Sequence, residues 1–85
     1  MKTIYFIVMD TTKKREDPLQ MYFYTRNALS DLCGILTAVA EDHGTPVSKM
    51  RLYIAPDKKT WDRMYNEFCA RADWSKWGDR AEIHA

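Results

Sequence analysis

Hydrophobic and polar residues follow two different periods along this chain, and the two periods separate strands from helices. Residues 19–24 and 49–55 alternate between apolar and polar side chains, which is the period-two pattern of strands with one buried face. Residues 2–9 are mostly β-branched or aromatic, with apolar residues at both parities from Ile4 to Met9. A strand of this composition is predicted to lie in the middle of a sheet, where both of its faces are covered.

Two longer segments repeat their apolar residues with the period of an α-helix. Residues 26–44, around which the other elements are organised, carry an apolar stripe of Leu29, Leu32, Cys33, Leu36, Val39 and Ala40. Thr25 is expected to cap the first turn of this helix, and Gly44 to end it in a left-handed conformation. A second helix is expected after Asp57, with a stripe of Trp61, Met64, Tyr65, Phe68, Cys69 and Ala72.

The predicted elements follow the order β-β-α-β-α, and residues 80–84 are expected to add a short edge strand. A hairpin followed by a helical crossover places the third strand beside the first, so the expected antiparallel sheet has the strand order 2-1-3. The fold class is predicted to be α+β, a two-layer sandwich with both helices on one face. Phe6, Phe23 and Leu52 are assigned to that face. The expected core comprises Phe6, Phe23, Leu36, Leu52 and Phe68.

The composition is that of a single domain, residues 1–85, with balanced charge. Apolar residues make up 46% of the sequence, and 13 basic residues against 12 acidic ones leave a net charge of +1. This charge does not favour a dedicated duplex-DNA binder, which carries an excess of basic residues. No apolar run approaches the roughly 20 residues of a membrane span, and no signal-peptide pattern is found, so a cytoplasmic protein is expected. Cys33 and Cys69 are accordingly predicted to be buried free thiols.

The sequence contains no recognisable catalytic, metal-binding or cofactor-binding motif. Its 2 histidines lack the paired spacing of a zinc site, there is no glycine-rich phosphate loop, and the serines fall in no nucleophile motif. His43 is expected to interact with the dipole at the end of the first helix. The prediction is a protein without enzymatic activity, cofactor or small-molecule substrate.

Four of the 5 tyrosines alternate with the expected core residues along the three predicted strands. They are therefore expected on the face of the sheet opposite the core. Tyrosine offers a large contact area with little side-chain entropy to lose, so it suits binding surfaces. The predicted partner-binding residues on and beside this tyrosine face are Tyr5, Tyr22, Tyr24, Arg51, Tyr53, Trp74 and Trp77. The other interpretation is that the C-terminal tail folds over the same face through its tryptophans.

The function predicted from this surface is that of a non-enzymatic protein-binding module. It would be an accessory or inhibitor protein of the phage or plasmid type that occludes a larger protein partner, or a protein that self-associates as a homodimer. The alternative ligand is single-stranded nucleic acid, with bases stacked on the tyrosines and phosphates bound by Arg51 and by basic residues such as Lys49. A helix-turn-helix centred on Gly44 fits poorly, because residues 50–54 alternate with period two rather than 3.6.

Overall fold

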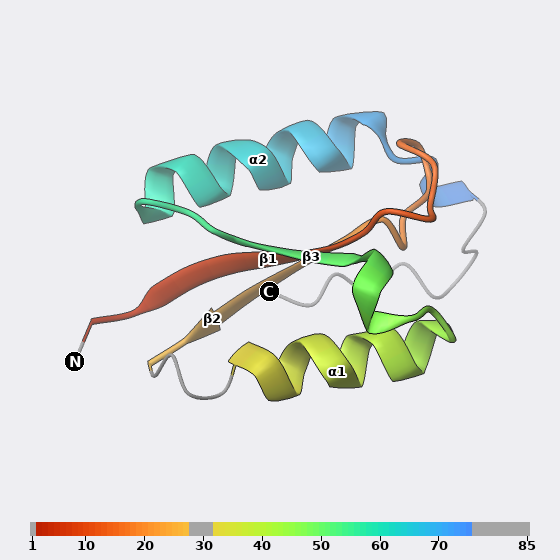
Figure 1. The fold of residues 1–85 in the computed structure, drawn as a ribbon. Helices are drawn as coiled ribbons and strands as arrows, with labels where there is room; N and C mark the ends of the chain where they lie inside the picture. Colours follow the sequence, from red (N-terminus) through yellow and green to blue (C-terminus); the bar gives the residue numbers. More distant parts are fainter. Residues whose placement is uncertain (1, 28–31, 76–85) are drawn as a thin grey trace.

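The computed structural model describes residues 2–27 and 32–75 of the chain. Its elements are the strands β1 (Ile4–Asp10), β2 (Met21–Arg26) and β3 (Met50–Ile54), the helices α1 (Leu32–His43) and α2 (Lys58–Arg71), and a 3-10 turn, η2 (Val47–Lys49). The element order and the antiparallel sheet with strand order β2-β1-β3 confirm the predicted α+β fold (Figure 1). The strand predicted at residues 80–84 and the first residue of the predicted α1 stripe, Leu29, lie outside the described residues.

The register of β1 with its two neighbours decides which side chains share a face of the sheet. Phe6 lies opposite Tyr24 on β2, whereas Ile7 lies opposite Phe23 on β2 and Tyr53 on β3. Directly opposed residues of an antiparallel pair point to the same face. Phe23 and Tyr53 therefore share the face of Ile7. Tyr24 lies on the opposite face with Phe6.

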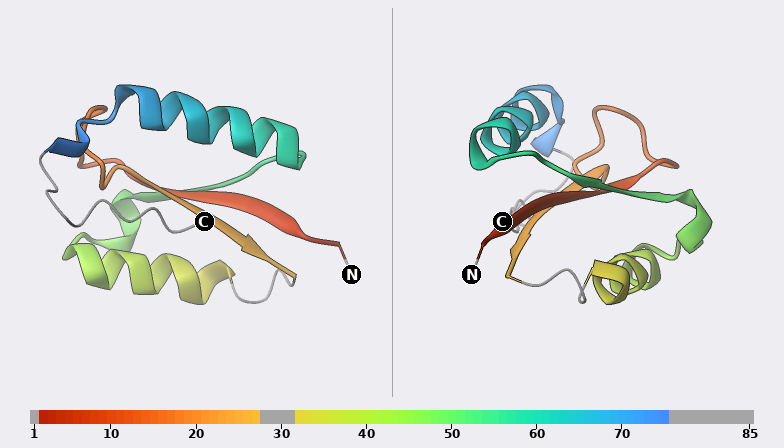
Figure 2. Two further views of the ribbon diagram at one scale, coloured as in Figure 1. Left: turned by 180° about the vertical axis from the view of Figure 1, so that it is seen from behind. Right: turned by 60° about the vertical axis from the view of Figure 1, so that its left-hand side comes forward.

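The two helices cover opposite faces of the sheet, so the molecule has three layers (Figures 1 and 2). Helix α1 packs on the face of Phe6 and Val8, and α2 packs on the face of Ile7 and Phe23. The prediction of a two-layer sandwich with both helices on one face is therefore wrong. The central strand is apolar at both parities, and one helix on each side is needed to bury both of its faces.

The sheet divides the apolar core into two clusters. On the α1 face the buried members are Phe6, Val8, Leu32, Val39, Ala40 and Met50. On the α2 face they are Ile7, Phe23, Ala55, Trp61 and Phe68. The three phenylalanines of the predicted core are buried as expected, but Phe6 and Phe23 belong to different clusters. Leu36 and Leu52 are half-buried against the α1 cluster.

Local capping interactions fix two helix ends that the sequence predicted. The side chain of Asp57 accepts a hydrogen bond from the backbone N–H of Thr60 at 2.8 Å, and so caps the first turn of α2. Gly44 follows α1 at a φ of 65°, and the N–H of Thr45 then bonds to the carbonyl of Ala40 at 3.0 Å. This reversal satisfies a carbonyl at the end of α1 and turns the chain toward β3.

Two predictions about the first helix are wrong. Thr25 does not cap α1, because β2 continues through it to Arg26 and Thr25 remains in the sheet. Cys33 is exposed rather than buried, since α1 turns Ile35 and Leu36 toward the sheet and leaves Cys33 outside this contact. Both cysteines are free thiols, as predicted, and Cys69 is half-buried.

Candidate functional site

The four tyrosines of the predicted binding face are divided between the two faces of the sheet. Tyr22 and Tyr24 pack against the α1 cluster, and Tyr5 packs against the α2 cluster. Tyr53 is paired with Ile7, which places it on the α2 side. The prediction of a single tyrosine face is therefore wrong. It matched the parity of β2 to that of β1, but β1 is apolar at both parities and provides no marker for the register.

Three of these tyrosines act as packing groups. The Tyr24 ring stacks on Phe6 with a centroid distance of 5.6 Å, and the Tyr5 ring lies 5.8 Å from the indole of Trp61. Burial, with a smaller contribution from Tyr24 beside it, raises the pKa of Tyr22 to about 12. These side chains stabilise the two cores and offer little free surface to a partner.

The remaining predicted site residues lie in different places. Trp74 is half-buried and lies edge-on to Phe68, with ring centroids 5.7 Å apart. Trp77 lies outside the described residues. Arg51 and Tyr53 are both exposed and both belong to β3. The structure therefore leaves two of the predicted residues together on one accessible element.

β3 is an edge strand that carries the exposed large apolar side chains of the described residues. It pairs with β1 on one side and has no neighbouring strand on the other within the described part of the chain. Val47, Tyr53 and Ile54 are 44%, 42% and 47% exposed, and all three lie on η2 or β3. Natural proteins protect such an edge or use it for pairing, because its free backbone groups and apolar side chains attract other strands.

The backbone of β3 also presents hydrogen-bonding groups to the open edge. The N–H of Ala55 donates to the carbonyl of Tyr5 at 2.8 Å, and the N–H of Thr11 donates to the carbonyl of Lys49 at 3.0 Å. Along an antiparallel strand, the backbone groups of successive residues point alternately to one side and the other. Because the odd-numbered residues of β3 bond to β1, the N–H and C=O groups of the even-numbered residues point outward.

The even-numbered residues of β3 differ in whether their outward N–H and C=O groups already form hydrogen bonds. The N–H of Met50 donates to the carbonyl of Val47, and the carbonyl of Met50 accepts a 3.2 Å hydrogen bond from Nη1 of Arg51. No such contact occupies the outward N–H and C=O groups of Leu52 and Ile54 among the described residues. The segment from Leu52 to Ile54 is called the β3 edge below.

A pocket adjoins the β3 edge where the strand ends. It has a volume of about 870 Å³ and is lined by the start of β1, the end of β3 and the start of α2, including Ile4, Tyr5, Ile54 and Lys58. Ile54 belongs to both the pocket and the edge. A strand that paired with β3 would therefore run toward this pocket at one end.

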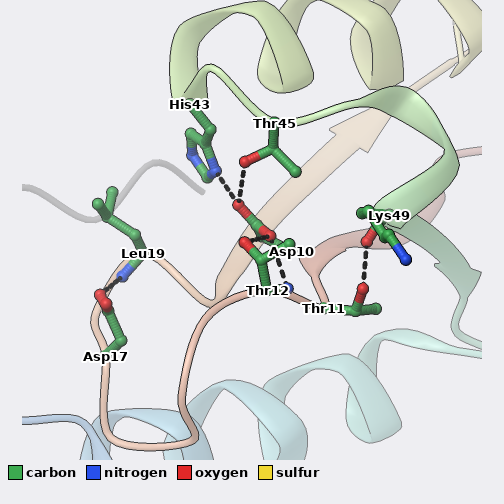
Figure 3. Close-up of polar contacts among 8 residues, drawn as sticks. All are labelled: Asp10, Thr11, Thr12, Asp17, Leu19, His43, Thr45 and Lys49. Atoms are coloured by element: carbon green, nitrogen blue, oxygen red, sulfur yellow. Dashed lines mark hydrogen bonds and ion pairs between the residues drawn. The ribbon is translucent and has the colours of Figure 1, made fainter.

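A second feature, which sequence reasoning missed, is a buried carboxylate at the end of β1 (Figure 3). Asp10 is 1% exposed, and its Oδ1 accepts hydrogen bonds from the N–H and Oγ1 of Thr12 at 2.9 and 2.6 Å. Its Oδ2 accepts a 3.1 Å hydrogen bond from Oγ1 of Thr45 and lies 2.9 Å from Nδ1 of His43. Burial raises the pKa of Asp10, but the hydrogen bonds outweigh burial and lower the pKa to about 2.

His43 connects the end of α1 to this carboxylate, a contact beyond the helix-dipole interaction predicted for it. The His43 side chain is 3% exposed, and its ring lies edge-on to Tyr22 with centroids 4.7 Å apart. Its Nε2 is buried and has no hydrogen-bond partner within the described ranges. A catalytic Asp–His pair presents this nitrogen to a nucleophile or substrate. Here the nitrogen is buried, and the contact between His43 and Asp10 joins the end of α1 to the end of β1.

Comparison with known proteins adds no assignment to these features. No protein-family model, curated protein or solved structure matches the chain significantly. Neither helix in the described ranges has the length and apolarity needed to cross a membrane. Residues 2–27 and 32–75 also hold no group of three or more His, Cys, Asp or Glu side chains arranged for a metal ion.

Among the described residues, the β3 edge combines outward-facing backbone groups that have no hydrogen-bond partner with exposed apolar side chains. Sequence reasoning identified Arg51 and Tyr53 as site residues but not Ile54, because Ile54 shares the parity of Leu52, which was expected on the covered face. The predicted strand order, which makes β3 an edge strand, was the signal that would have found Ile54. Ile54 is the last residue of this edge strand, and it is exposed although Leu52, at the same parity, is half-buried.

Proposed function

We propose that this protein is a non-enzymatic binding module that pairs its β3 edge with an extended segment of a protein partner. The observation that carries the proposal is that outward-facing backbone groups at Leu52 and Ile54 coincide with exposed side chains at Tyr53 and Ile54. An added strand would satisfy the backbone groups and cover the apolar side chains, as in complexes formed by strand addition.

A protein partner is better supported than single-stranded nucleic acid. Stacking of bases requires open aromatic side chains beside a basic groove. Here helices cover both faces of the sheet (Figure 2). Tyr22 and Tyr24 pack against the α1 cluster. A net charge of +1 also gives little general attraction for phosphates.

The role that we propose for this binding is that of an accessory or inhibitor protein of the phage or plasmid type. Pairing at the β3 edge would occlude a surface of a larger protein without any chemical step. We also propose a cytoplasmic location, which is supported by the exposed free thiol of Cys33, because such thiols persist in reducing compartments.

A displayed library of random peptides tests the proposal with no need to identify the partner first. Peptides selected on the wild-type protein are measured against Ile54→Lys, which charges the β3 edge, and Ala70→Lys, which makes the same change on the exposed side of α2. A charged residue on an edge strand opposes pairing, so we expect at least about tenfold weaker binding, roughly 1.4 kcal/mol, for Ile54→Lys alone.

N-methylation of the selected peptides provides a control for the backbone contacts. Methyl groups on the amides that face β3 should abolish binding, whereas methyl groups on the intervening amides should leave it intact, because strand addition uses alternate residues. Peptides that bind Ile54→Lys as tightly as the wild type would contradict the proposal. A selection that returns no edge-dependent peptide would also count against it.

A further inference from the structure

The backbone N–H and C=O groups and the apolar side chains of the β3 edge can pair with the same groups on a second copy. We infer that two copies of this chain pair through this edge, antiparallel, about a two-fold axis at Tyr53. The inference rests on the proposed function, since it uses the same strand-pairing edge, here with a second copy of the chain in place of the segment of a larger protein. It identifies one register among those that two such strands can adopt. The hydrogen-bonding groups and the side chains of β3 favour this register independently.

The hydrogen-bonding groups select the register. With the two-fold axis at Tyr53, Leu52 of each copy lies opposite Ile54 of the other. Opposed residues of this kind exchange two hydrogen bonds, so the two symmetry-related pairs use the outward N–H and C=O groups of both residues. An axis at Leu52 would instead require the N–H of Met50, which already donates to the carbonyl of Val47.

In this register, the apolar side chains of one β3 edge pack against the apolar side chains of the other copy. The two Tyr53 residues form a non-hydrogen-bonded pair across the axis on the α2 side, where opposed side chains approach most closely and aromatic pairs are favourable. On the α1 side, the exposed Ile54 side chain meets the half-buried Leu52 of the other copy. Pairing would therefore cover both of the exposed apolar side chains on β3.

The charged residues that flank the edge also agree with this register. Within the extended part of the chain, the pairing places Arg51 opposite Ala55, so no like charges are directly opposed. An axis at Arg51 would place two guanidinium groups face to face. The expected product is one continuous six-stranded sheet, with helices on both of its faces.

Disulfide cross-linking reports the register. In a background of Cys33→Ser and Cys69→Ala, a single new cysteine is introduced by Tyr53→Cys, by Leu52→Cys or by Lys59→Cys. Position 59 lies on the surface of α2 and is the control. Cysteines on the two-fold axis lie within disulfide geometry, so Tyr53→Cys should form dimers at least about tenfold faster than Lys59→Cys. Leu52→Cys should not exceed this control. Faster cross-linking at position 52, or equal rates at 52, 53 and 59, would overturn the register.

Sedimentation equilibrium of the unmodified protein reports the association itself. The apparent mass should rise above the 10.0 kDa of one chain toward twice that value as the concentration approaches about 1 mM. Ile54→Lys should remain at the mass of one chain, and Ala70→Lys should behave as the wild type.

A wild-type protein that stays monomeric throughout would overturn the dimer. If edge-dependent peptides still bind that monomer, the proposed function stands. If Ile54→Lys changes neither peptide binding nor mass, both fail.

Discussion

At the scale of single residues, the buried carboxylate of Asp10 is the most consequential group outside the β3 edge. It connects the end of β1 to the end of α1, because its partners are Thr12 on the loop after β1 and His43 and Thr45 on either side of Gly44. A carboxylate whose pKa is lower in the folded state than in the unfolded chain contributes to stability at neutral pH. Removal of one partner of a buried charge is strongly destabilising. The stability of the fold should therefore depend on the ionisation of this one group.

Replacement of Asp10 by Asn should reduce the free energy of unfolding at neutral pH by about 2 to 3 kcal/mol. The folded-state pKa of about 2 lies below the ordinary value of 3.8, so ionised Asp10 stabilises the fold above pH 4. This contribution is lost as the pH falls from about 4 to about 2. Urea titrations of both proteins between pH 2 and pH 7 measure the difference. A difference that does not shrink at low pH would contradict this account. Asp62→Asn, at a partly exposed carboxylate that pairs with Lys58, provides the control.

Phe23 is a buried strand residue whose truncation should cost a large part of the stability of the fold. Its ring is 1% exposed and contacts the rings of Trp61, Tyr65 and Phe68, so Phe23→Ala leaves a cavity in the α2 cluster. We expect a loss of about 3 to 5 kcal/mol in the free energy of unfolding. Tyr53→Ala, at an exposed position, should cost less than about 1 kcal/mol. Thermal or urea unfolding that gave similar losses for the two variants would contradict the assignment of faces.

At the scale of elements, α1 and its C-terminal end provide a matched pair of glycine substitutions. Gly34 lies within the helix and Gly44 follows it at a φ of 65°, and a Cβ atom added at either position would meet no other atom within 4 Å. Gly34→Ala should stabilise the protein by about 0.5 to 1 kcal/mol, because alanine loses less backbone entropy in a helix. Gly44→Ala should destabilise it by about 1 kcal/mol, because its conformation is left-handed. Urea unfolding that gave the same sign for both would contradict the described end of α1.

The sequence predicted the elements better than it predicted their faces. Period-two and period-3.6 patterns located each strand and helix, and Asp57 and Gly44 marked two helix ends correctly. The register was not predictable, because β1 is apolar at both parities and a shift of one residue exchanges the faces of β2. The placement of both helices and the grouping of the tyrosines depended on that register. The Asp10–His43 contact joins residues 33 positions apart and leaves no local pattern in the sequence.

At the scale of the whole molecule, helices cover both faces of the three-stranded sheet, so a partner would reach the sheet at its edge strands. The side chains of β2, the other edge strand, are buried or half-buried from Met21 to Thr25. β3 differs, since Tyr53 and Ile54 are exposed beside outward-facing backbone groups. Among the described residues, β3 is therefore the edge strand that combines outward-facing backbone groups with exposed apolar side chains, and the binding function proposed above rests on this asymmetry.

Amide hydrogen exchange of β3, followed residue by residue by NMR, tests this asymmetry most directly. In dilute protein the amides of Leu52 and Ile54 should exchange rapidly, and those of Arg51 and Tyr53 slowly, because only the latter pair with β1. On addition of a selected peptide, or at high protein concentration, Leu52 and Ile54 should become at least about tenfold more protected. Protection of Leu52 and Ile54 equal to that of Tyr53 in dilute monomer, or no change when a complex forms, would contradict an open edge that pairs with another strand.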